Sequence, residues 1–186
     1  MLSLLSVGLL STIAIAAPTP KAATPAPAPD AKVSPANYLL LHAPERRVRG
    51  ADPRMQSLLA EGLHRSRTFA ALVNQINRSD VIVYIESVMT LPKATMGRLA
   101  MMPMRGDVRY LRVQIRADLS RAEGIALIGH ELQHAIEIAG ADDVRDTAAL
   151  VRLYERIGHP SAGDHAYDTN AAQDTGRIVR RELAQS

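Results

Sequence analysis

The sequence has no cysteine and no tryptophan among its 186 residues. Without cysteine there can be neither a disulfide framework nor a thiolate metal site, so any transition-metal site must use His, Asp and Glu. Aromatic residues make up only 3% of the chain, so the core must be aliphatic, and single-strand nucleic-acid binders need more stacking surface than this. The net charge of +3 is far from the clustered basic stripe of a DNA-binding module. We therefore expect no nucleic-acid partner.

The N-terminal region carries the signals of an exported protein. Residues 1–16 contain no charged side chain, and Ala14-Ile15-Ala16 fits the cleavage pattern of a secretory signal peptide. The alternative is an uncleaved anchor helix, although the run is short of the ~20 residues that a membrane span needs. Residues 17–36 are dominated by Ala, Pro and Thr, a composition typical of an extended linker. We expect a periplasmic or secreted protein, whose N-terminal segment could associate with the cell envelope.

The remaining chain, residues 37–186, is long enough for one hydrophobic core. It begins with an Arg-rich, helix-like region, and VIVYIE at residues 81–86 then predicts a buried strand. GRLAMMPM and DVRYLRVQI flank Arg105-Gly106 and predict the two arms of a hairpin. One face of the second arm is expected to carry Arg109, Leu111, Val113 and Ile115. These patterns predict a small, mostly antiparallel sheet of about three strands.

After the predicted sheet, the sequence pattern becomes helical. Ser120, followed three residues later by Glu123, forms a capping box. It opens the apolar run IALIGHELQHAIEIA, which closes at Gly140. We therefore expect one long helix that contains the sequence HELQH at residues 130–134.

HELQH has the spacing of a metal site with a built-in base. His130 and His134 lie about 40° apart on the helix surface, one turn from each other, so both imidazoles can reach one ion. Glu131 lies about 100° round the helix from His130, where its carboxylate can take a proton from a metal-bound water. With six histidines in the chain, this pattern is expected by chance in only about 1% of such sequences.

On HELQH and its uncharged flanks, the sequence resembles the zincin metallopeptidases. The resemblance implies an active-site helix under a small sheet, an edge strand that holds an extended peptide, Zn²⁺ on both histidines, and hydrolysis by a Glu-activated water. The longer metzincin motif requires Gly at position 137 and His at position 140, where this sequence has Glu137 and Gly140. The gluzincin-like branch, with an acidic third ligand on a later helix, is closer.

A catalytic zinc takes three protein ligands and leaves one position open for water. We expect the third ligand to be Asp168, in the first turn of a last helix that Asp164 can cap. The small residues Ala171 and Ala172 would let this helix approach the HELQH helix closely. Gluzincins carry Glu at the ligand position, so the shorter Asp168 requires a closer backbone.

Alternatives to this ligand set remain open. Asp168 could instead be a helix-start residue favoured by the macrodipole. His165 competes as a ligand or as a donor to the oxyanion, and Tyr167 could serve the latter role. Glu137, one turn beyond His134 on the same face, is better suited to a place behind the ligands or to a salt bridge than to binding the ion, which a third ligand from the same helix would leave poorly surrounded. No role is assigned to His42, His64 and His159.

We therefore expect an α+β, zincin-like domain with a small mostly antiparallel sheet, an active-site helix and further C-terminal helices. The leading hypothesis is a periplasmic or secreted zinc-dependent peptidase that acts on peptide or protein substrates. Its catalytic candidates are Glu131, His165 and Tyr167. A second hypothesis is a non-catalytic envelope binding protein that retains the zincin frame, with or without the metal. A third is a purely structural periplasmic domain.

Overall fold

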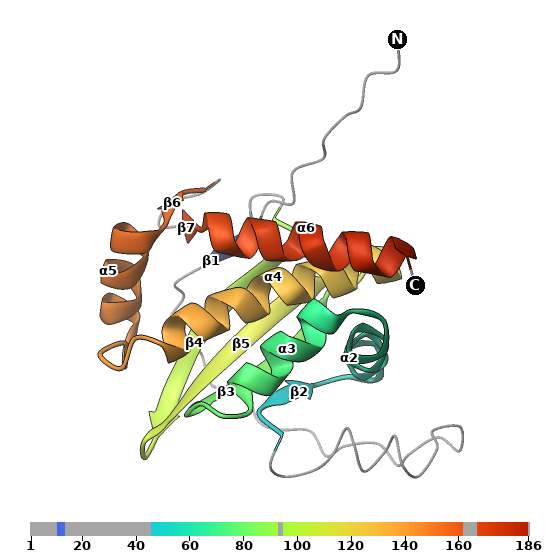
Figure 1. Cartoon of the computed structure of the whole chain (residues 1–186). Coiled ribbons are helices and arrows are strands. Elements are labelled where there is room, and N and C mark those ends of the chain that lie inside the picture. The colour runs from blue at the N-terminus through green and yellow to red at the C-terminus, as the bar shows by residue number, and fades with distance from the viewer. Residues whose placement is uncertain (1–10, 14–45, 93–94, 162–166, 186) are drawn as a thin grey trace.

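The computed structural model describes residues 11–13, 46–92, 95–161 and 167–185 (Figure 1). The strands of its main sheet are β1 (Ser11–Ile13), β2 (Val48–Gly50), β3 (Val81–Val88), β4 (Gly97–Arg105) and β5 (Val108–Arg116). The helices are α2 (Pro53–Arg65), α3 (Arg67–Ile76), α4 (Arg121–Ala139), α5 (Thr147–Ile157) and α6 (Asn170–Gln185). A short ladder joins β6 (His159–Pro160) to β7 (Tyr167–Asp168). The predicted α+β class is confirmed.

The main sheet is mixed, which corrects the expected mostly antiparallel sheet of about three strands. Its five strands run in the order β1-β4-β5-β3-β2. Only β4 and β5 pair antiparallel, whereas the other three pairs are parallel. The expected hairpin is therefore present, but β5 also pairs along its whole length with β3. Two helices connect β2 to β3, and such a crossover is what a parallel pair requires.

The turn of the β4–β5 hairpin lies where the sequence indicates. Gly106 has a φ of 61°, a left-handed conformation that glycine adopts without steric cost. Beyond the turn the side chains of β5 alternate as predicted, and the face that carries Arg109, Leu111, Val113 and Ile115 is the buried one.

Side-chain caps fix where the helices begin. Asp52 accepts a hydrogen bond from Met55 N at the start of α2, and Ser66 accepts one from Phe69 N at the start of α3. At the start of α4 both halves of the capping box are formed by Ser120 and Glu123, as predicted. Such caps satisfy backbone N–H groups that the first turn leaves without a partner.

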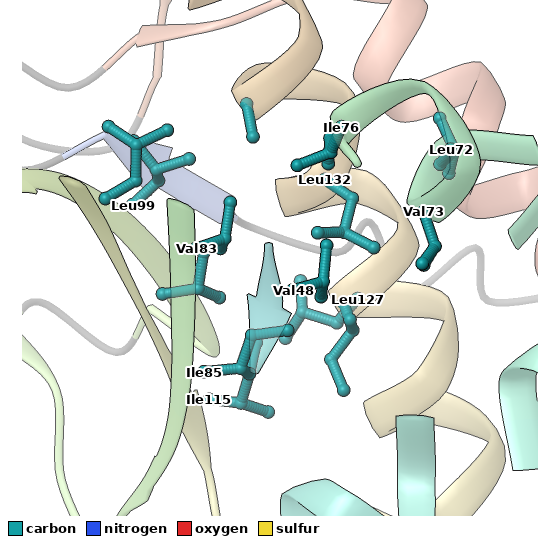
Figure 2. Packing of buried hydrophobic residues seen from close by; sticks show 14 of the residues in the cluster. Val48, Leu72, Val73, Ile76, Val83, Ile85, Leu99, Ile115, Leu127 and Leu132 are labelled. Carbon is teal, nitrogen blue, oxygen red and sulfur yellow. The ribbon is translucent and has the colours of Figure 1, made fainter. Parts of the chain in front are cut away.

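The core lies between the sheet and the helices and is almost entirely aliphatic, as the composition predicts. In Figure 2 the sheet residues Val83, Ile85 and Ile115 lie opposite Leu127 and Leu132 of α4. All five of these side chains are fully buried. The apolar positions of α4 therefore hold this helix against the sheet, and its polar HELQH residues are buried with it.

The N-terminal strand β1 lies at the edge of the sheet. It pairs parallel with β4, and Ser11 lies opposite Gly97. Residues 1–10 and 14–45 lie outside the described part of the chain, so the signal peptide and the linker stay predictions. Within the described residues, no helix has the length and apolar character needed to cross a membrane.

Candidate metal centre

The HELQH residues lie deep in the molecule because α4 is covered on two sides. The sheet packs against one side, and α6 runs alongside the other (Figure 1). The approach of α6 is close, since a Cβ added at Gly176 would lie 3.5 Å from His130 Cβ. His130, Glu131 and His134 are each no more than 1% exposed.

Asp168 reaches this site from a strand and not from a helix. It is the last residue of β7, and α6 begins two residues later at Asn170. The expectation that Asp168 lies in the first turn of the last helix is therefore wrong, because Asp168 directly precedes the residue that caps α6. The helix cap is Thr169, whose hydroxyl accepts a hydrogen bond from Ala172 N.

Three side chains converge on one point. His130 Nε2 lies 3.2 Å from His134 Nε2 and 3.3 Å from Asp168 Oδ1. The third side of this triangle, from His134 Nε2 to Asp168 Oδ1, measures 3.5 Å. Four donors at the roughly 2.0–2.2 Å typical of zinc ligands, placed tetrahedrally, are about 3.3 to 3.6 Å apart. The residues could therefore hold a metal ion of this size, and their nitrogen and oxygen donors suit zinc.

Glu137 supports the outer side of His134. Its Oε2 accepts hydrogen bonds from His134 Nδ1 at 2.9 Å and from the Tyr154 hydroxyl at 3.2 Å. Its Oε1 accepts a hydrogen bond from Thr169 Oγ1 at 2.7 Å. A carboxylate on Nδ1 fixes the ring orientation and directs the Nε2 lone pair inward, as in many metal sites. The supporting role expected for Glu137 agrees with this geometry.

Burial and charge set the protonation of the site. Burial raises the pKa of Glu131 to about 8. Burial acts to lower the pKa of His134, but the hydrogen bonds with Asp168 and Glu137 outweigh it and raise that pKa to about 9. Burial acts to raise the pKa of Asp168, yet its contacts with both histidines hold it far below the usual range. The site thus pairs an ionised Asp168 with a protonated His134 when no metal is bound.

Glu131 faces the sheet at the start of β4. A Cβ added at Gly97 would lie 3.0 Å from Glu131 Oε1 and equally close to Leu127. A larger residue at this position would crowd the carboxylate and force it or Leu127 to shift. Because Ser11 of β1 lies opposite Gly97, a strand on this edge of β4 passes close to Glu131.

The other candidate residues have different outcomes. Tyr167, in β7, is half-buried and packs against the hydrophobic core, and its catalytic role stays a prediction. His165 lies outside the described residues. His64 is exposed on α2. His159, which was assigned no role above, lies opposite Asp168 in the β6–β7 ladder and contacts Gln173.

Comparison with known proteins identified no relative of this chain. A scan against protein-family models, a search of curated proteins and a search of solved structures each returned no match. The functional argument therefore depends on the geometry of the site itself.

Proposed function

We propose that this protein is a zinc-dependent peptidase of the zincin type. The observation that carries the proposal is the triangle of His130 Nε2, His134 Nε2 and Asp168 Oδ1, with sides of 3.2 to 3.5 Å. Three protein donors leave one position of a tetrahedral ion open, which is the arrangement of catalytic zinc sites. Zinc, when bound, supplies Lewis acidity that polarises a carbonyl and acidifies a water.

Glu131 is the proposed general base. It follows the first histidine ligand on α4, and burial raises its pKa to about 8. A general base works best when its pKa is close to the working pH. It is then basic enough to take a proton from water, and a substantial fraction of it is ionised and ready to do so. In the proposed mechanism Glu131 accepts a proton from the attacking water and passes it to the amine that leaves.

The substrate in this proposal is an extended peptide that pairs with the edge of β4. That edge is the one on which β1 lies, and a Cβ on Gly97 of β4 would lie only 3.0 Å from Glu131 Oε1. Since β1 belongs to the predicted signal peptide, removal of residues 1–16 would free this edge. In this proposal the protein acts in the periplasm or outside the cell.

The burial of the site favours a second candidate function. His130, Glu131 and His134 are almost fully buried, which suits a non-catalytic envelope protein that keeps the metal and binds a partner. The two candidates differ in turnover. Metal analysis of residues 17–186, followed by digestion of a broad peptide library, separates them. Zinc with cleavage supports the peptidase, and zinc without cleavage supports the binding protein.

Loss of one ligand should remove the metal. We expect wild type to bind about one zinc, and His130→Ala and Asp168→Ala to bind none at micromolar zinc, since two donors are too few to hold the ion. Elemental analysis after dialysis measures this. His64→Ala is the matched control because His64 is exposed on α2. Equal zinc in wild type and both ligand variants would contradict the proposed site.

Zinc affinity should depend on pH. A histidine ligand must lose its proton before it binds metal, and the pKa of His134 is raised to about 9 in the metal-free protein. The apparent affinity should therefore rise about tenfold per pH unit from pH 6, and level off near pH 9. Competition with a calibrated chelator at pH 6, 7 and 8 tests this. An affinity that stays constant over that range would show that His134 is already neutral.

A further inference from the structure

The two oxygens of the Asp168 carboxylate have different neighbours. Oδ1 is the atom that faces His130 and His134, and it also accepts a hydrogen bond of 2.7 Å from Thr169 N. Oδ2 accepts a hydrogen bond of 2.9 Å from Gln173 Nε2. The carboxylate is therefore held from both ends, with a single oxygen directed at the histidines.

Gln173 is itself held in place by His159. Gln173 Nε2 lies 3.3 Å from His159 Nε2, and an amide nitrogen has two hydrogens, so it can donate to the histidine and to Asp168 together. The reverse orientation of the amide would place its oxygen against the Asp168 carboxylate, where two acceptors repel. The chemistry therefore fixes the nitrogen toward Asp168.

We propose that Gln173 is a positioning residue that makes Asp168 a one-oxygen metal ligand. This inference rests on the metal site of the proposed function. A carboxylate can bind an ion through one oxygen or through both, and a second oxygen would take the position that a catalytic zinc keeps open for water. The hydrogen bond from Gln173 to Oδ2 fixes the orientation of the carboxylate, so that Oδ1 alone meets the ion and that position stays open, and His159 keeps Gln173 in the required orientation.

Cobalt substitution reports the number of ligands directly. Four-coordinate Co²⁺ absorbs visible light strongly, and five- or six-coordinate Co²⁺ absorbs weakly. The protein is loaded with Co²⁺ alone, and its visible spectrum is recorded per bound ion. Gln173→Met keeps the side-chain length but removes the donor, and Gln173→Glu keeps the shape. Gln185→Met is the control, since Gln185 is exposed at the far end of α6.

We expect strong absorption from wild type and Gln185→Met, and at least a twofold loss per bound ion in both Gln173 variants. Circular dichroism identifies any variant that fails to fold, and the other Gln173 variant then decides the result. If Gln173 only stabilises α6, melting temperatures will fall while the spectrum per bound ion stays as in wild type, and the inference is overturned. If wild type binds no Co²⁺ or Zn²⁺, the proposed metal site fails, and this inference fails with it.

Discussion

Glu131→Gln should retain the metal, lose hydrolysis by about 10²-fold or more, and make the metal-free protein more stable. Glu131 is not one of the three converging donors, so zinc content should equal that of wild type. An amide cannot accept the proton from water, which removes general-base catalysis. Peptide turnover of the zinc-loaded variant tests this, and turnover equal to wild type would remove Glu131 from the mechanism.

The gain in stability follows from the raised pKa. The unfolded chain releases the Glu131 proton near pH 4.5, whereas burial keeps that proton on the folded protein up to about pH 8. Between these values the folded state binds more protons, so the stability of the metal-free protein falls as pH rises. Relative to its value below pH 4.5, the free energy of unfolding is about 2 to 4 kcal/mol lower at pH 7. It stops falling above pH 8.

Glutamine resembles the protonated form of Glu131 but does not titrate, so the Glu131→Gln variant should not lose stability in this way as pH rises. The stability difference between Glu131→Gln and wild type should therefore be near zero at pH 4 and largest at pH 8. Urea unfolding with a chelator present, at both pH values, measures it. A difference that is the same at pH 4 and pH 8 would show that Glu131 does not titrate in this range. The combination of higher stability and lost activity is typical of a group kept for chemistry at a cost in folding.

Arg109→Ala should lower the free energy of unfolding by about 3 to 5 kcal/mol. The Arg109 side chain is fully buried, and its Nη2 and Nε donate to Asp80 at 2.6 and 2.7 Å. Nη1 donates to the carbonyl oxygens of Ile138 and Ala141 at 2.8 and 2.7 Å. The guanidinium therefore satisfies carbonyl groups at the C-terminal end of α4, where positive charge is also favoured by the helix dipole.

Truncation removes the side-chain hydrogen bonds to Ile138 O and Ala141 O, which keep only their backbone donors, and leaves Asp80 without its guanidinium partner. Arg112→Ala is the matched control, because Arg112 lies on the same strand with its side chain 37% exposed. We expect that control to change stability by less than about 1 kcal/mol. Urea unfolding compares the two variants at pH 7. If Arg109→Ala and Arg112→Ala are equally stable, the buried guanidinium has no special role in holding α4.

The HELQH helix could be predicted because its signals are local. The capping box, the apolar run and Gly140 all act within one element, and the hairpin turn at Gly106 is likewise local. The parallel pairing of β3 with β5 depends on segments that are distant along the chain, so no local pattern indicates it. The same holds for Arg109: the alternation placed it on one face with Leu111, Val113 and Ile115, but indicated neither its burial nor its partners.

Within the site, the candidate ligands could be predicted from the sequence more easily than the elements on which they lie. The two histidines were evident from spacing, and Asp168 from its place near small residues. Its location in β7 was missed, because the two-residue β6–β7 ladder is too short to leave a strand pattern. The contact between His159 and Gln173 was missed for the same reason, since that ladder brings His159 opposite Asp168. Tyr154 and Thr169, which hold Glu137, carry no distinguishing signal in the sequence.

The short β6–β7 ladder has a consequence for how folding and metal supply are connected. Two of the three donors lie within α4, but the third depends on a strand of two residues that leads directly into α6. An ion that binds all three donors joins these two parts of the chain and is lost whenever they separate. By mass action it stabilises the closed arrangement, by about 2.7 kcal/mol at a concentration one hundred times the dissociation constant. If the proposed zinc site is correct, zinc availability would then affect how long β7 and α6 stay docked on α4, and hence their exposure to proteases.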